Sequence, residues 1–295
     1  MHLQTRCRAV KSRFGGLLVI AALALSGCAN LEVVGKFAKT SAATADYQQV
    51  VVDYADSPRR QRSYQPERMA AQLDALVKRR AEQKPQLEGS QKVLVEYMSA
   101  LGDLAADKLP NVDDEIDGIG KSLETAQFVG DGDAQIGKKT ATAAASIAKV
   151  LVRAVLDAWR QCQLIKIVKE SDPHLQIVVA GLKEVLDKDL RGSLDNEELA
   201  VSKPFQAWIA AATSGNDPDG APSVARILLS ERLEQVQGKL AKLDAYIRVL
   251  DTIGKGHADL FANVDKMDGK TLKTRLQVYS KDLQTLHKAI KDLSK

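Results

Sequence analysis

The chain has 295 residues, of which 45% are hydrophobic but only 4% aromatic, and it carries 42 Lys and Arg against 38 Asp and Glu. The whole basic excess comes from Arg6, Arg8, Lys11 and Arg13, so the rest of the chain is formally neutral and lacks the electrostatic footprint of a nucleic-acid-binding protein. Few aromatic residues and many Ala, Leu and Lys favour long, slim helices over a thick globular core.

The first element is an apolar run from Phe14 to Leu25, directly after the basic residues. Its length suits the core of a signal peptide and falls short of the roughly 20 residues that a membrane-spanning helix needs. Small residues then lead to a cysteine in the sequence Leu25-Ser26-Gly27-Cys28. This segment resembles the lipobox of bacterial lipoproteins.

The resemblance implies that residues 1–27 are a cleaved signal peptide and that Cys28 is the lipidated first residue of the mature protein. The cysteine thiol would carry diacylglycerol and the freed amine a further acyl chain, which together make a stable membrane anchor. Ala29 and Asn30 follow, where an Asp would imply retention in the inner membrane. The resemblance therefore implies the periplasmic face of a Gram-negative outer membrane. The alternative is an ordinary cleaved signal peptide with a chance cysteine.

Processing at this point also decides the cysteine chemistry. Cys7 leaves with the signal peptide and Cys28 is acylated, so Cys162 keeps the one remaining thiol. No internal disulfide is then possible. We expect Cys162 to be a small buried hydrophobe on a helix.

Beyond the anchor, apolar residues recur every three or four positions, which is typical of helices, and no segment reads as a strand. We expect residues 28–295 to form a single all-α domain, an elongated antiparallel helical bundle. The predicted helical segments, in chain order, are 31–56, 66–83, 85–109, 112–127, 134–170, 171–190, 193–212 and 222–295.

Prolines and polar residues mark the predicted breaks. Ser57-Pro58 should end the first helix, Pro85 should break or restart the second, and Ser171-Asp172-Pro173 should be a capped restart. Ser193 or Asp195 is expected to cap a further helix. Ser214 to Pro222, rich in Gly, Asp and Pro, is the clearest loop in the chain.

The strongest periodicity predicts a coiled-coil-like helical hairpin over residues 222–295. Apolar residues there repeat at alternating spacings of four and three, which is the seam of a coiled coil. A turn at Met267-Asp268-Gly269 separates the two arms and makes them antiparallel. The seam residues are Leu229, Leu233, Val236, Leu240, Leu243, Ile247, Leu250, Gly254, His257, Phe261 and Val264, then Leu272, Leu276, Tyr279, Leu283, Leu286, Ile290 and Leu293.

Two motifs come close to known ligand-binding loops. Gly132 to Lys139 nearly matches a phosphate-binding loop, but Lys139 stands where a Ser or Thr should bind magnesium, and we read the segment as a loop that enters a helix. Asp113, Asp117 and Glu124 fall at positions of a calcium-binding loop. Position three of that pattern is Glu115, however, so this is a weak metal candidate, and acids are also favoured at a helix N-terminus.

Other residues give little sign of catalysis. His174, His257 and His287 belong to no metal-binding or catalytic spacing, and no serine nucleophile motif is present. His257, beside two glycines on the hairpin seam, reads as a polar gap in a long helix or as a pH-sensitive or partner-binding hinge. Trp159 and Trp208 are expected to be packing residues. We expect no cofactor and no enzymatic activity.

The sequence therefore predicts a lipid-anchored envelope lipoprotein, held to the membrane through Cys28, that acts as a helical binding or scaffolding module for a protein partner. One alternative is a component or an inhibitor in a secretion, efflux or toxin system. Another is a cell-envelope hydrolase whose site is assembled from scattered carboxylates.

Overall fold

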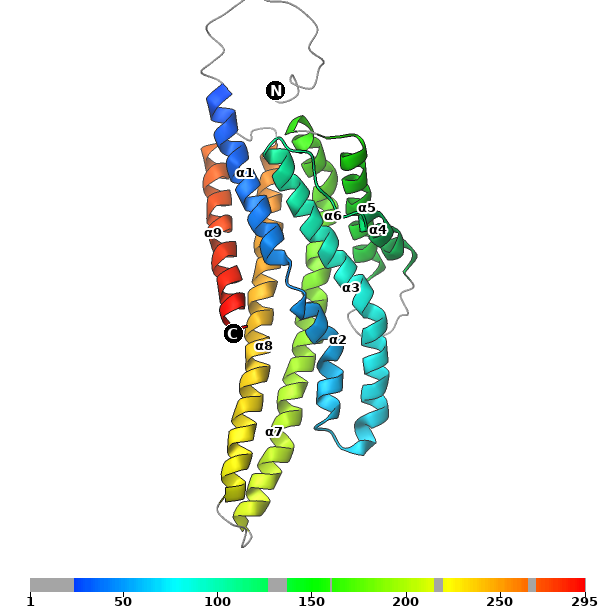
Figure 1. Cartoon of the computed structure of the whole chain (residues 1–295), viewed down its shortest axis with the longest axis vertical. Helices are drawn as coiled ribbons and strands as arrows, with labels where there is room; N and C mark the ends of the chain where they lie inside the picture. The colour runs from blue at the N-terminus through cyan, green and yellow to red at the C-terminus, as the bar shows by residue number, and fades with distance from the viewer. Residues whose placement is uncertain (1–23, 127–136, 160, 215–219, 265–268, 295) are drawn as a thin grey trace, which may run out of the picture.

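The computed structural model describes residues 24–126, 137–159, 161–214, 220–264 and 269–294. Within these ranges every regular element is a helix, and the helices form the predicted elongated antiparallel bundle (Figure 1). In chain order the elements are α1 (Ala24–Ala45), α2 (Gln49–Arg62), η2 (Glu67–Met69), α3 (Ala70–Ala105), α4 (Ile116–Thr125), α5 (Lys138–Leu156), η3 (Gln161–Gln163), α6 (Leu164–Glu184), η4 (Val185–Leu190), α7 (Arg191–Ser214), α8 (Gly220–Ala262) and α9 (Lys270–Asp292).

Four helices form the centre of the bundle. They pack in a closed ring, with α1 on α3, α3 on α6, α6 on α8 and α8 on α1. On one flank α9 covers α1 and α8, and on the other α5 covers α3 and α6 and carries α4. Phe37, Leu101, Leu175 and Leu250, one from each helix of the ring, are fully buried in one continuous apolar cluster. Burial of each such side chain stabilises the fold by about 1.5–3 kcal/mol.

The longest part of the molecule is the α7–α8 hairpin. The helix that begins as α6 continues through the π-helical segment η4 into α7 without a break. α7 then packs against α8, and the pair extends beyond the other helices (Figure 1). Its tip, at the predicted loop 214–222, lies at the end of the molecule opposite to the start of α1; residues 215–219 are outside the described ranges.

The predicted antiparallel pairing of α8 with α9 is confirmed. The Arg275 guanidinium and the Tyr279 hydroxyl of α9 donate to the Asp259 carboxylate of α8 at 2.8 and 2.9 Å. Seam residues such as Leu250 and Leu283 are buried between these helices and their neighbours. α9 covers only the C-terminal part of α8, since the N-terminal part of α8 packs on α7.

The predicted breaks at prolines are wrong. Pro58 lies inside α2, Pro85 inside α3 and Pro173 inside α6, each with the helix intact on both sides. A proline leaves the carbonyl four residues earlier without its usual donor. At Pro58 that carbonyl belongs to Tyr54, and the neighbouring Ser57 hydroxyl donates to it at 3.4 Å.

The predicted long helix over 134–170 is also wrong, because the chain turns between α5 and α6. Ala158 adopts a left-handed conformation with φ of 48°. The amides of Ala158 and Trp159 donate to the carbonyls of Val155 and Ala154 at 3.0 and 2.9 Å, which is a Schellman helix end. Such an end is normally signalled by Gly, and here the position holds Ala. Trp159 is buried beside it, as expected of a packing residue.

The expected first helix, 31–56, is divided into α1 and α2. The last carbonyl of α1, on Ala45, accepts hydrogen bonds from the Gln91 amide of α3 at 3.0 Å and the Tyr246 hydroxyl of α8 at 2.9 Å. Gln91 also donates to the Tyr47 carbonyl at 3.1 Å. These contacts come from distant segments, so they fix a helix end that local sequence does not encode.

The ring helices approach closely at Gly256 of α8, which gives a test of the core. A Cβ at this position would lie 2.3 and 2.5 Å from two ring carbons of the buried Phe37. We expect Gly256→Ala to lower the free energy of unfolding by about 1–3 kcal/mol, because the core would be overpacked. Gly238, also within α8, has open space around it and is the matched control. Gly238→Ala should raise the free energy of unfolding by up to about 1 kcal/mol in the same urea titration. Equal effects at both positions would contradict this packing.

Candidate functional site

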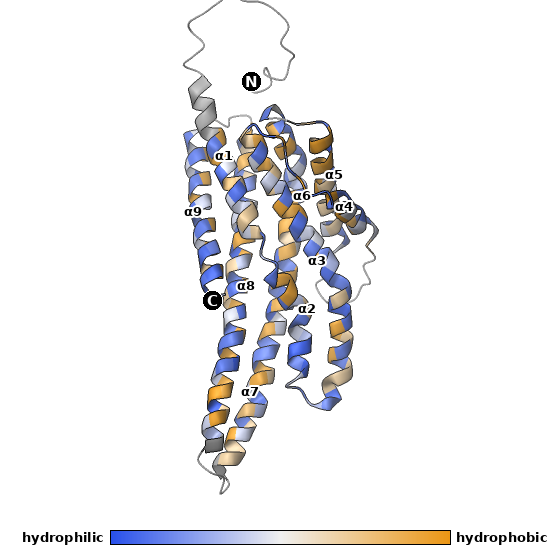
Figure 2. Cartoon of the chain, viewed as in Figure 1, coloured by the Kyte–Doolittle hydropathy of each residue, from blue (hydrophilic) through white to orange (hydrophobic). Residues whose placement is uncertain are grey.

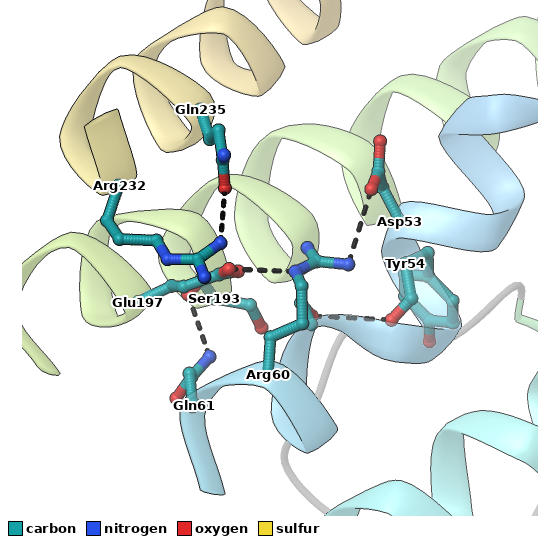
Figure 3. Close-up of polar contacts among 9 residues, drawn as sticks. Asp53, Tyr54, Arg60, Gln61, Ser193, Glu197, Arg232 and Gln235 are labelled. Atoms are coloured by element: carbon teal, nitrogen blue, oxygen red, sulfur yellow. Dashed lines mark hydrogen bonds and ion pairs between the residues drawn. The ribbon is translucent and has the colours of Figure 1, made fainter. Parts of the chain in front are cut away.

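A largely buried ion cluster joins α2 to α7 at the base of the α7–α8 hairpin, hereafter the hairpin (Figure 3). Nε of Arg60 donates to Oε1 of Glu197 at 2.7 Å, and Nη1 of Arg60 lies 3.3 Å from Oδ1 of Asp53. The Glu197 and Asp53 side chains are only 5% and 9% exposed. One guanidinium therefore balances two buried carboxylates, and each of the three groups depends on the others for its charge pairing.

Further polar contacts hold the same helices in register. The Gln61 amide donates to the Ser193 carbonyl at 2.8 Å, as Figure 3 shows. Arg80 of α3 donates to the Ser193 hydroxyl at 3.2 Å and to the Asp189 carbonyl, in the π-helical segment η4, at 3.3 Å. Its guanidinium stacks 4.0 Å from the ring centroid of Tyr54. Ser193, predicted as a helix cap, therefore serves inside a helix as a link to two other helices.

A pocket of about 170 Å³ lies next to this cluster, between the C-terminal end of α2, α7 and α8. Arg60 and Glu197 line its base side, and α8 contributes Arg232, Gln235 and Lys239. Arg232 is exposed and donates to Gln235 on its own helix at 3.0 Å. Most of the lining residues are charged or polar, so the pocket offers several groups that can bind a small polar ligand.

Several large apolar side chains are exposed along the hairpin. Trp208 is 43% exposed and Ile227 is 59% exposed, and Leu199, Val224 and Leu228 are exposed as well. Figure 2 shows hydrophobic residues at this end of α7 and α8, where no third helix covers them. Trp208, expected to be a packing residue, packs against the Phe205 ring at a centroid distance of 6.2 Å but remains partly exposed. A monomer rarely leaves such a patch without an interaction partner.

A second polar group lies in the centre of the ring, where Tyr97 and His257 are fully buried and Asp172 is nearly so. Nε2 of His257 (α8) lies 2.7 Å from the Tyr97 hydroxyl (α3), and Nδ1 of His257 lies 2.7 Å from Oδ1 of Asp172 (α6). Burial raises the pKa of Tyr97, which stays protonated. Burial acts to raise the pKa of Asp172, but hydrogen bonds from His257 and Gln176 outweigh it and lower that pKa. All three groups are paired, so this network is a structural link and not an open site.

The sequence-predicted site residues are dispersed. Cys28 lies in α1, four residues after its first residue. Asp113, Asp117 and Glu124 are not brought together: each pairs with a lysine, Lys92 at 2.8 Å, Lys121 at 2.6 Å and Lys149 respectively. In the described ranges no group of three or more potential ligands could hold a metal ion.

Most of the near-match to a phosphate loop, residues 132–136, lies outside the described ranges. The helix it was expected to enter is α5, which begins at Lys138 after the extended Gly137. The side chain of Cys162, in η3, is likewise not described. His257 was expected to be a polar gap in the seam, and it is instead a paired core residue.

Comparisons with protein-family models, with characterised proteins and with solved structures find no match for this chain. Each helix in the described part of the chain is too short or too polar to cross a membrane. Sequence reasoning did not single out Arg60, and it missed the pairing of Arg60 with Glu197, which is 137 positions away. No local signal marks that pair.

The ion cluster predicts a sharp contrast between adjacent arginines. Arg60→Gln would leave two buried carboxylates without their cation and should lower the free energy of unfolding by about 3–5 kcal/mol. Arg59, the matched control, is 71% exposed and forms a surface pair with Asp56 at 3.4 Å. Arg59→Gln should change stability by less than about 0.5 kcal/mol. Urea denaturation of both variants measures the difference, and similar losses in the two would show that the cluster is not stabilising.

Proposed function

We propose that this chain is a lipid-anchored protein of the bacterial envelope whose projecting hairpin binds a partner protein. The Leu25-Ser26-Gly27-Cys28 sequence supports the anchor. α1 begins at Ala24 and enters the bundle directly, so a lipid on Cys28 would hold the body close to the membrane. The hairpin end points the other way, as Figure 1 shows.

The observation that carries the binding role is the apolar and sparsely charged end of the hairpin. Between Lys203 and Arg226 the sequence has no charged residue except Asp217 and Asp219, which stand between the two helices. Trp208 and Val224 are exposed within this stretch, and the exposed Ile227 and Leu228 directly follow Arg226 on α8. A surface with little charge and several large exposed apolar side chains favours an apolar partner, and the ridges of side chains on these helices could pack against those of a further helix.

The occupant we propose is an apolar helical face of another protein rather than a lipid bilayer. Insertion of the hairpin tip into a membrane would carry Asp217 and Asp219 into the hydrocarbon, where each ionised carboxylate is costly. Packing of a partner along α7 and α8 does not require that step. A binding module of this kind needs no catalytic centre, and it fits the binding and scaffolding role that the sequence predicts.

The anchor is tested by the chemistry of the N-terminus. In the producing bacterium, the mature chain should begin at Cys28 and carry acyl chains, detected by mass spectrometry and by incorporation of a clickable palmitate analogue. Cys28→Ser should abolish the label, because the serine hydroxyl cannot form the thioether. Cys162→Ser is the matched control and should keep the label. An unmodified Cys28 in the wild-type protein would refute the anchor.

The partner surface is tested by a photo-crosslinking amino acid placed at Ile227 in cells. The control position is Gln237, which is also exposed on α8 but lies nearer the base of the hairpin. We expect an adduct at Ile227, and none at Gln237, in which the crosslinked peptide is an apolar helical segment of a different protein. An adduct of two copies of this chain, an adduct with lipid alone, or no adduct would each overturn the proposed partner.

A further inference from the structure

The pocket at the base of the hairpin holds polar atoms whose hydrogen-bonding capacity is not used within the described part of the chain. Oε2 of Glu197 and Nη2 of Arg60 are both buried and have no hydrogen-bond partner there. Glu197 as a whole is only 4% exposed. Leaving a buried charged atom unpaired is unfavourable, so these atoms point to a missing donor for Glu197 and a missing acceptor for Arg60.

The charges around these atoms favour an anion. Arg60, Arg232 and Lys239 line the pocket with positive charge, while Glu197 is its one acidic lining residue. Asp53 lies behind Arg60, on the other side of the guanidinium, as Figure 3 shows. Arg232 and Lys239 have no carboxylate partner in the described ranges, so their charge is free to attract a ligand.

We propose that this pocket binds a small hydroxy acid. Its carboxylates would pair with Arg232 and Lys239 at the rim, and its hydroxyl would donate to Oε2 of Glu197. An oxygen of the ligand would accept from Nη2 of Arg60. Because the two inner atoms are shielded from solvent, entry requires a rim side chain to move. Arg232, exposed and held by one hydrogen bond to Gln235, is the residue that moves.

Two related ligands distinguish the contribution of the carboxylate charges from that of the hydroxyl group. Malate and succinate have the same carbon chain and the same charge at pH 7, but only malate has a hydroxyl. Isothermal titration calorimetry on the purified protein, at constant ionic strength, should show saturable binding of malate. Succinate should bind about tenfold more weakly, because it leaves Glu197 without a donor.

Variants at the rim test the location. Lys239→Gln and Arg232→Gln should each weaken malate binding at least about fivefold, and both are accessible enough to keep the fold. Lys242→Gln, one turn further along α8 and outside the pocket, should bind malate as the wild type does. No saturable malate binding, or equal losses in all three variants, would overturn the site. Equal affinity for malate and succinate would overturn the role of Glu197. None of these outcomes depends on the anchor or on the partner at Ile227.

Discussion

The hydrogen-bonded chain from Tyr97 through His257 to Asp172 is the interaction on which the rest of the bundle depends. It joins α3, α8 and α6 at the centre of the four-helix ring, with His257 fully enclosed. An apolar seam tolerates small shifts of one helix along another, whereas a buried polar chain loses its pairing when a helix slides by one residue. The network therefore fixes the relative heights of three helices. Gly256 is next to His257 in α8, and Phe37 of α1 packs against it. This contact positions α1, the fourth helix of the ring.

Polar links continue from this centre along α6, α7 and α8. His257 pairs with Asp172, the Gly254 carbonyl accepts from Gln176 at 3.0 Å, Asp251 pairs with Lys183 at 2.7 Å, and Asp244 pairs with Arg191 at 2.6 Å. Each successive link lies later in one helix and earlier in the other, as antiparallel pairing requires. The continuous helix formed by α6, η4 and α7 is therefore held by the ring at its α6 end and by ion pairs with α8 along its middle.

The fold class and the C-terminal pairing could be predicted because both depend on local periodicity. Leu250 and Leu283 each belong to a series of apolar residues at heptad spacing, one series on α8 and the other on α9. That spacing alone places both series on a common seam. The missed end of α1 arose where distant side chains, Gln91 and Tyr246, bind the Ala45 carbonyl. The other errors arose where local structure departs from the usual signal of the residue type. Pro58 lies inside α2, where the Ser57 hydroxyl donates to the carbonyl that the proline leaves without its usual donor. Ala158 ends a helix without the glycine that would announce it.

The candidate site was beyond sequence reasoning for a related reason. Arg60 and Glu197 carry no motif, and only the packing of α2 on α7 makes them neighbours. The three acids that did form a motif, Asp113, Asp117 and Glu124, each find a lysine within reach and do not converge. A spacing pattern specifies a metal site only when the backbone forms a loop that brings the ligands around one point. Here Asp117 and Glu124 lie in the straight helix α4, which keeps them apart.

The distribution of polar links also supports the proposal that a partner binds at the hairpin end. The inter-helix links described above end at Arg191 and Asp244, and the Arg60 cluster ties α7 to α2 only as far as Glu197. Beyond Glu197 the two helices hold each other through small and apolar residues such as Ala212 and Ala225, both buried. Small residues bring two helices close together and leave the larger ones, Trp208 and Ile227, on the outside. Large apolar side chains that are exposed to water on the α7–α8 hairpin contribute little to the stability of the monomer. Their burial against a partner would supply free energy of association.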